Sequence, residues 1–217
     1  MSSTHESKNL FLEGPVGKLE AVLWTPHGAP PTVAAVVCHP HPLFGGTMHN
    51  KVVFQAAKAM DSLGIAVLRF NFRGAGLSEG THDRGRGELD DVRTALNFLA
   101  GEFPDASLVL AGFSFGCWVG LRVGCEQARV TRLIAIGAPV NSSDFSYLLQ
   151  CAKPKLFVHG SNDEHGTIAK VRELVKSLPG ESELIVVDGV DHFFAGKIEQ
   201  LGSAIRGWLQ TAGHGSA

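Results

Sequence analysis

The sequence predicts an α/β protein with a central, mostly parallel sheet of about eight strands, helices on both faces and no cap domain. Short continuous apolar segments, typical of strands buried on both faces, alternate with segments whose apolar residues recur at helical spacing. This alternation is the pattern of a parallel sheet covered by helices. The chain has 217 residues, 44% of them hydrophobic and 18% charged. We therefore expect a single domain over residues 1–217 with a full hydrophobic core.

The expected strands are of two kinds. Residues 18–24 alternate in polarity, and residues 9–12 precede them across a Gly-Pro pair, which predicts a hairpin at the edge of the sheet. The remaining strands are apolar segments that suit the buried interior of a parallel sheet: residues 33–38, 65–70, 107–111, 133–136, 155–158 and 183–187.

The expected helices carry one apolar stripe each, which we expect to pack on the sheet. They cover residues 53–63, 89–99, 168–178 and 198–209, with a further helical stretch after residue 116. A short helix is also expected at 144–150, between a strand that ends near residue 140 and the next that begins near residue 155. A connection of 15 residues is ordinary for an α/β unit, so no length remains for a cap.

Composition excludes several classes of protein and of site. The net charge of −2 and the absence of a basic stripe disfavour nucleic acid as a partner. No apolar segment approaches the ~18 residues of a membrane span, and the polar start shows no secretory signal, so we expect a cytoplasmic protein with no membrane partner. The four cysteines show no zinc or redox spacing and His39 and His41 lack a third ligand, so we expect free thiols and no metal.

Residues 112–116 read Gly-Phe-Ser-Phe-Gly and lie between an expected strand and an expected helix. A G-x-S-x-G sequence in this context is typical of a serine nucleophile on a sharp, strained turn. The alternative is an ordinary turn in which Ser114 caps the helix. The context favours Ser114 as a nucleophile.

A serine nucleophile needs a base, and the base needs a carboxylate that orients it. Asp163 follows the expected strand 155–158, and His192 follows the expected strand 183–187. The order Ser114, Asp163, His192 leaves gaps of 49 and 29 residues for the intervening strands and helices. We therefore predict Ser114 as nucleophile, His192 as base and Asp163 as orienting acid. Asp188 and Asp191 compete with Asp163, because they lie near His192 in sequence.

Five motifs together resemble those of α/β-hydrolases, and the resemblance covers essentially the whole chain. They lie at residues 39–50, 69–78, 112–116, 159–163 and 191–192. The sequence most resembles small bacterial serine hydrolases without a lid, grouped with dienelactone-hydrolase-like and serine-aminopeptidase-like proteins. This resemblance implies an α/β-hydrolase fold. Dienelactone hydrolases themselves carry cysteine as nucleophile, so the serine here points away from dienelactones and toward esters or thioesters.

The oxyanion of a tetrahedral intermediate needs fixed N–H donors. The first expected donor is the backbone N–H of Phe115, directly after the nucleophile. The second should come from the loop after residues 33–38, where Pro40 and Pro42 have no N–H and leave His41 or Leu43. The pattern of the resembled family favours His41.

Side chains near these motifs suggest a binding pocket. We expect Leu43, Phe44 and Phe193 to contribute to an apolar acyl pocket, with Phe113, Phe145, Tyr147 and Phe194 as further candidates. Arg73 is a candidate for binding a substrate carboxylate. We favour a structural role instead, in which its guanidinium binds loop carbonyls or Asp83.

The leading functional prediction is a serine hydrolase that cleaves small carboxylic esters or thioesters through an acyl-enzyme, without a cofactor. Its expected partner is a small-molecule acyl substrate. An acyltransferase or an aminopeptidase with the same three residues is an alternative within enzymology. A non-catalytic binding protein is the alternative from another class, because fold alone does not fix function.

Overall fold

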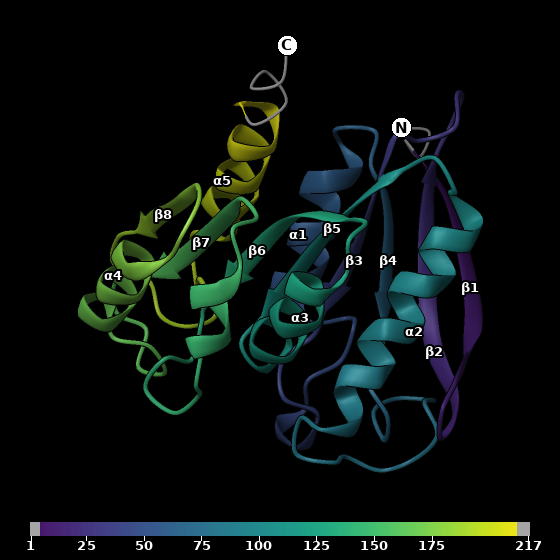
Figure 1. The fold of residues 1–217 in the computed structure, drawn as a ribbon, viewed down its shortest axis with the longest axis horizontal. Helices are drawn as coiled ribbons and strands as arrows, with labels where there is room; N and C mark the ends of the chain where they lie inside the picture. Colours follow the sequence, from purple (N-terminus) through teal and green to yellow (C-terminus); the bar gives the residue numbers. More distant parts are fainter. Residues whose placement is uncertain (1–4, 212–217) are drawn as a thin grey trace.

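The computed structural model describes residues 5–211, and within them eight strands form one sheet (Figure 1). The expected sheet of about eight mostly parallel strands is confirmed. Its order is β1-β2-β4-β3-β5-β6-β7-β8, in which β1 and β2 run antiparallel to their neighbours and the other strands are parallel. The strands are β1 His5–Gly14, β2 Gly17–Pro26, β3 Val33–Cys38, β4 Ala66–Phe70, β5 Ser107–Phe113, β6 Val130–Ile136, β7 Lys155–Gly160 and β8 Ser182–Val187. Residues 1–4 and 212–217 of the expected domain lie outside the described residues.

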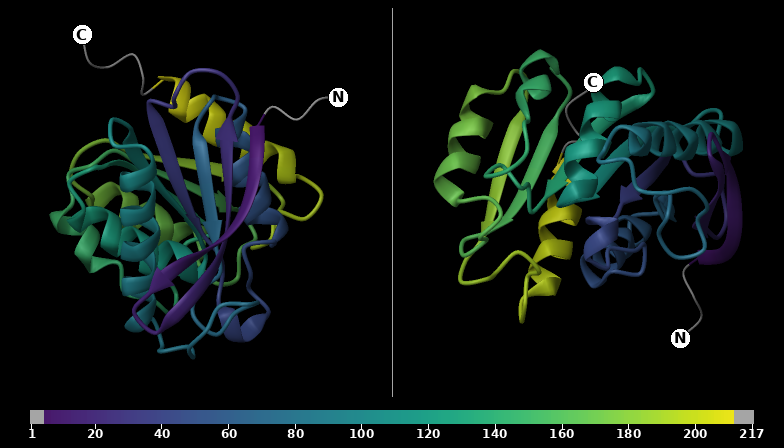
Figure 2. Two further views of the ribbon diagram at one scale, coloured as in Figure 1. Left: turned by 90° about the vertical axis from the view of Figure 1, so that its right-hand side faces the viewer. Right: turned by 90° about the horizontal axis from the view of Figure 1, so that it is seen from below.

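Helices cover both faces of the sheet, as expected (Figure 2). One face packs against α1 (Lys51–Asp61) and α5 (Ile198–Thr211), which also contact each other. The other face packs against α2 (Gly87–Glu102), α3 (Phe115–Glu126) and α4 (Ile168–Ser177). The sheet therefore separates two hydrophobic cores, and each expected apolar stripe faces one of them.

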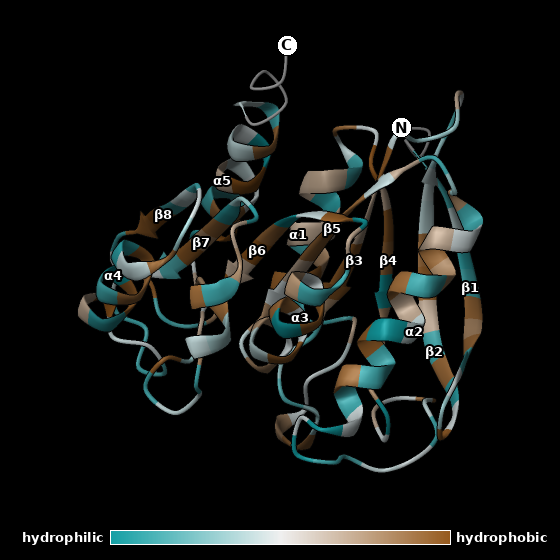
Figure 3. Ribbon diagram, viewed as in Figure 1, coloured by the Kyte–Doolittle hydropathy of each residue, from teal (hydrophilic) through white to brown (hydrophobic). Residues whose placement is uncertain are grey.

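The central strands explain why the sequence forms this sheet. All six residues of β3 are apolar and five of them are buried, since helices lie on both of its faces. Figure 3 shows β3 and β5 coloured mainly as hydrophobic. At one edge, β1 and β2 form the expected hairpin around Pro15 and Val16, with Gly14 paired to Gly17.

The connection between β6 and β7 differs from the expectation in detail. Strand β6 ends at Ile136 and not near residue 140, so the connection spans residues 137–154. It contains the 3₁₀ helix η2 (Ser146–Gln150) in place of the longer helix expected at 144–150, and no cap domain. Pro139, three residues beyond the end of β6, cannot donate to a strand ladder.

The topology gathers the loops that carry the sequence motifs. Strands β3, β5, β6, β7 and β8 are parallel, so their carboxyl ends meet at one edge of the sheet. In open α/β sheets this edge is where ligands bind. Among residues 5–211, no helix is both long enough and apolar enough to cross a membrane.

Candidate active site

Ser114 occupies a strained turn between β5 and α3. Its φ of 55° and ψ of −120° are rare for a residue with a side chain. The turn is crowded: a Cβ on Gly112 would lie 2.4 Å from the Gly116 carbonyl oxygen, and a Cβ on Gly116 would lie 2.4 Å from that of His39. The two glycines of the motif are therefore required by backbone contact, and they present Ser114 at the carboxyl end of β5.

His192 and Asp163 are joined by a buried hydrogen bond. His192 Nδ1 lies 2.7 Å from Asp163 Oδ2, and the two residues are only 2% and 4% exposed. The other carboxylate oxygen of Asp163 accepts the backbone N–H of His165 at 2.8 Å. Burial alone would raise the pKa of Asp163, but the hydrogen bond from His192 and the adjacent imidazoles outweigh it, so the pKa lies below its usual value. Asp163 is therefore an ionised acceptor that fixes the His192 ring.

The two competing carboxylates are engaged elsewhere. Asp188 accepts a hydrogen bond from the Ser161 hydroxyl at 3.1 Å. Asp191 accepts the backbone N–H groups of Phe193 and Ala195 at 3.0 Å each, which shapes the loop that carries His192. Of the three aspartates, the structure brings only Asp163 to the His192 ring.

The two expected oxyanion donors have backbone N–H groups with no acceptor among residues 5–211. Phe115 is the first residue of α3, where the N–H has no partner within the helix. The N–H of His41 is likewise unpartnered, whereas that of Leu43 donates to His41 Nδ1 at 3.3 Å. Between the two residues that the prolines leave open, the arrangement favours His41.

His39, which the sequence analysis did not single out as a site residue, orients the peptide that bears the His41 N–H. Its Nδ1–H donates to the Pro40 carbonyl oxygen at 2.6 Å, and its Nε2 accepts the backbone N–H of Phe72 at 2.9 Å. The Pro40 carbonyl and the His41 N–H belong to one trans peptide unit and point in opposite directions. His39 therefore holds that peptide with its N–H directed away from the imidazole.

A second buried imidazole, that of His159, lies beside Asp163. His159 Nε2 donates to the Gly166 carbonyl oxygen at 2.6 Å and lies 3.4 Å from Asp163 Oδ2. Burial lowers the pKa of His159. The neutral ring therefore holds the loop of residues 163–166 against the end of β7 through its hydrogen bond to Gly166. It was missed because a histidine within an apolar strand is equally typical of a core residue.

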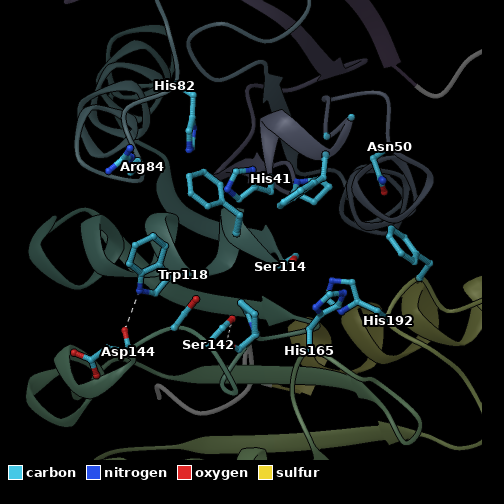
Figure 4. A pocket seen from close by; sticks show the side chains of 18 residues that line it. His41, Asn50, His82, Arg84, Ser114, Trp118, Ser142, Asp144, His165 and His192 are labelled. Atoms are coloured by element: carbon cyan, nitrogen blue, oxygen red, sulfur yellow. Dashed lines mark hydrogen bonds between the residues drawn. The ribbon is translucent and has the colours of Figure 1, made fainter.

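A cavity of about 490 Å³ lies over Ser114 and His192 (Figure 4). Phe44 and Phe193 line it. The expectation for Leu43 is not met: this residue lies in the 3₁₀ helix η1 (Pro42–Phe44), is 69% exposed and does not line the cavity. Of the further candidates, Phe113, Phe145 and Phe194 are buried core residues. The cavity is also lined by Pro40, His41, Gly45, Gly46, Asn50, His82, Arg84, Phe115, Trp118, Pro139, Ser142, Ser143, Asp144 and His165.

Arg73 has the expected structural role but another partner. Its guanidinium binds the buried carboxylate of Asp91 on α2 through two nitrogens, at 2.7 and 3.0 Å, and Asp83 is not involved. The helix turns Asp91 toward the sheet, whereas Asp83 accepts from Arg86 and from the N–H of Gly87. Within the described part of the chain, no group of three histidine, cysteine or acidic side chains is placed to hold a metal ion.

Comparisons with known proteins indicate the family of this chain. Residues 31–153 match the family model described as serine aminopeptidase, S33. An uncharacterized protein of Rickettsia prowazekii is 37% identical over 211 residues, which cover 93% of this chain and 88% of the relative.

Two solved structures are similar over nearly their whole length. An alpha-beta serine hydrolase homologue from Coxiella burnetii is 39% identical with a TM-score of 0.88, covering 93% of this chain and 97% of that one. A Xanthomonas campestris protein, described as an a/b serine hydrolase without lid, is 38% identical with a TM-score of 0.88 and 95% of both chains covered. This chain therefore belongs to the α/β-hydrolase superfamily, among its small serine hydrolases without a lid.

Proposed function

We propose that this protein hydrolyses small carboxylic esters or thioesters, with Ser114 as nucleophile, His192 as general base and acid, and Asp163 as the orienting carboxylate. The observation that carries the proposal is the buried 2.7 Å hydrogen bond between His192 and Asp163, beside a serine on a strained turn at the same cavity.

The chemistry follows from the roles of the three residues. Ser114 Oγ attacks the acyl carbonyl carbon and gives its proton to His192 Nε2, since Nδ1 is held by Asp163. The tetrahedral intermediate collapses, and the leaving alcohol or thiol takes that proton. Water, deprotonated by His192, then cleaves the acyl-enzyme and restores the serine. Ser114 Oγ has no hydrogen-bond partner among the described residues, and such contacts often tighten only when substrate binds.

The unpartnered N–H groups of Phe115 and His41 support a role as oxyanion donors. Each would donate to the negative oxygen that develops during attack, and loss of one such donor typically costs about 3 kcal/mol of transition-state stabilisation. His39 contributes indirectly, because it holds the Pro40–His41 peptide in one orientation.

The lining of the cavity favours ester over aminopeptidase activity. An aminopeptidase binds a free α-ammonium group, which calls for an available carboxylate. Asp144 is the one aspartate or glutamate that lines the cavity among residues 5–211, and its oxygens accept the N–H and the hydroxyl of Ser146 at 2.8 Å each. These contacts hold the carboxylate directed away from the cavity in Figure 4, so it is not placed to bind an amine there.

Replacement of the nucleophile tests the proposal. Ser114→Ala should keep the fold, checked by circular dichroism, and lower kcat for p-nitrophenyl butyrate by several orders of magnitude. Ser203→Ala, an exposed serine on α5, is the matched control and should retain activity. A fluorophosphonate probe should label wild-type protein at Ser114, as located by mass spectrometry. A Ser114→Ala variant with a tenth of wild-type kcat would contradict the assignment, and absence of labelling would favour a binding protein.

A further inference from the structure

Three residues other than glycine have a left-handed backbone within residues 5–211, and all three lie at the cavity or beside it. They are Arg84, Ser114 and Phe194, with φ of 54°, 55° and 55°. Such conformations are costly and cluster at functional sites. Ser114 is the proposed nucleophile, and Phe194 follows the His192–Phe193 pair. Arg84 also lines the cavity, and the mechanism above gives it no role (Figure 4).

The backbone on both sides of Arg84 is fastened. The buried carboxylate of Glu88 accepts the N–H groups of Asp83 and Gly85, the two neighbours of Arg84, at 2.8 Å each. A Cβ on Gly85 would lie 2.5 Å from the Trp118 ring, so the loop sits directly on that side chain. Trp118 itself lines the cavity. The strained backbone of Arg84 is therefore imposed by its surroundings, so the point from which its side chain extends at the cavity is fixed.

The positive charge of Arg84 is not compensated within the cavity. No acceptor lies within hydrogen-bonding distance of its guanidinium in the part of the chain that the structure describes. Among residues 5–211, only two arginine, lysine, aspartate or glutamate residues line the cavity, Arg84 and Asp144. Asp144 binds Ser146, and its carboxylate points away from the cavity in Figure 4. The cavity therefore offers a free, planar cation on the side of Ser114 away from His192.

We propose that Arg84 binds a carboxylate of the substrate, so that the natural substrate is an anionic ester or thioester. This inference rests on the proposed hydrolase function and adds the class of substrate to it. A guanidinium can donate two parallel hydrogen bonds to a carboxylate and stays charged at every physiological pH. Trp118 and His41 line the cavity with Arg84 and provide apolar and aromatic surface for the part of the substrate that joins the carboxylate to the ester.

A matched set of esters tests the anionic group on the acyl side. The p-nitrophenyl ester of hexanoate, the mono-p-nitrophenyl ester of adipate and the p-nitrophenyl ester of 6-aminohexanoate differ in the charge at the end of the acyl chain. Charge-assisted hydrogen bonds predict that wild-type kcat/KM for the adipate ester exceeds that for the hexanoate ester by about tenfold or more. The aminohexanoate ester should be the poorest of the three. For the alcohol side, 4-acetoxybenzoate is compared with its methyl ester in the same way.

Two arginine variants separate binding from long-range charge. Arg84→Gln should bring the ratio of anionic to neutral kcat/KM to within about twofold of unity. Arg86→Gln removes the same charge from the same loop, but Arg86 is 79% exposed in its side chain and does not line the cavity, so the preference should persist. A preference in either series that Arg84→Gln abolishes supports the proposal. A lack of preference in both series, or a preference that survives Arg84→Gln, overturns it.

A binding measurement separates this proposal from the proposed function. Ser114→Ala protein should bind adipate in calorimetric titration, and the additional Arg84→Gln change should weaken that binding about tenfold or more. Arg84-dependent binding in a protein that hydrolyses no ester would overturn the hydrolase function alone. Ester hydrolysis without Arg84-dependent binding or preference would overturn the anionic substrate alone.

Discussion

At the scale of single residues, the protonation state of the buried His39 imidazole decides how the Pro40–His41 peptide is held. Burial, the largest effect, lowers the pKa of His39 to about 4, so the ring is neutral near pH 7. Only the neutral ring can accept the Phe72 N–H at Nε2 while it donates to Pro40 from Nδ1. In a protonated ring, Nε2 would carry a hydrogen and would face the Phe72 N–H, so two donors would oppose each other.

The depressed pKa of His39 predicts a loss of stability in acid. The unfolded chain binds a proton at His39 near pH 6.5, whereas the folded protein binds it only near pH 4, so stability is complete above pH 6.5 and declines as the pH falls toward 4. The contribution of this one residue is about 3 kcal/mol.

Urea denaturation of wild type and His39→Gln, at pH 7 and pH 4, measures that contribution. Between these values, the free energy of unfolding of wild type should fall by about 3 kcal/mol more than that of the variant. His159 also has a depressed pKa, but it is present in both proteins and cancels in the difference. The same pH dependence in both proteins would show that His39 does not titrate in this way.

At the scale of elements, two loops together determine the position of His192. The loop after β7 supplies Asp163 as its hydrogen-bond partner, and the loop after β8 carries His192 itself, with Asp191 accepting two backbone N–H groups. One aspartate therefore acts on the imidazole and the other on the backbone.

This division predicts different effects of two isosteric replacements. Asp163→Asn should lower kcat for a short-chain ester by about 10³–10⁴-fold, because an amide does not stabilise the imidazolium and favours the wrong tautomer. Asp191→Asn should lower kcat far less, and Asp188→Asn should have little effect. Steady-state kinetics with p-nitrophenyl butyrate and thermal denaturation of each variant provide the comparison. Equal losses of kcat in all three would contradict the role of Asp163.

Strands were predictable from sequence where apolar residues run without interruption. The bounds of β3 were predicted to the residue, because each of its six residues is apolar and its neighbours are not. Strand β5 continues two residues further than expected, since Gly112 interrupts the apolar pattern while its backbone still pairs with Cys38 and Ala135. Strand β6 begins three residues earlier, because Thr131 and Arg132 hide its start from a search for apolar runs.

Site residues were predictable where the order of strands brings them together. Ser114, Asp163 and His192 each follow a strand of one parallel sheet, so chain order alone placed them at one edge. The partner of Arg73 was not predictable, because the rotation of α2 decides that Asp91 and not Asp83 faces it. The role of His39 depends on Phe72, 33 residues away, and no local pattern reports such a contact.

At the scale of the whole molecule, the active site is open because the chain between β6 and β7 contains no cap. Residues 137–154 are used to cross from one strand to the next, with one short 3₁₀ helix. The rim of the cavity includes Phe44 and Phe193, which are 86% and 41% exposed. A long acyl chain would therefore leave the cavity past these side chains into water.

This openness predicts the dependence of activity on acyl length. A methylene that is fully buried contributes about 0.8 kcal/mol, or about fourfold in kcat/KM, whereas one that remains in water contributes little. For a series of p-nitrophenyl esters, we expect kcat/KM to be highest for acyl chains of about two to six carbons and to gain little beyond that length. The rate should also show no jump at the solubility limit of the substrate, since there is no lid for a lipid surface to open. The measurement is kcat/KM from two to twelve carbons, together with rates on tributyrin below and above saturation. A steady increase to twelve carbons, or a jump in rate when the emulsion forms, would mean that the loop over residues 137–154 moves to enclose the chain.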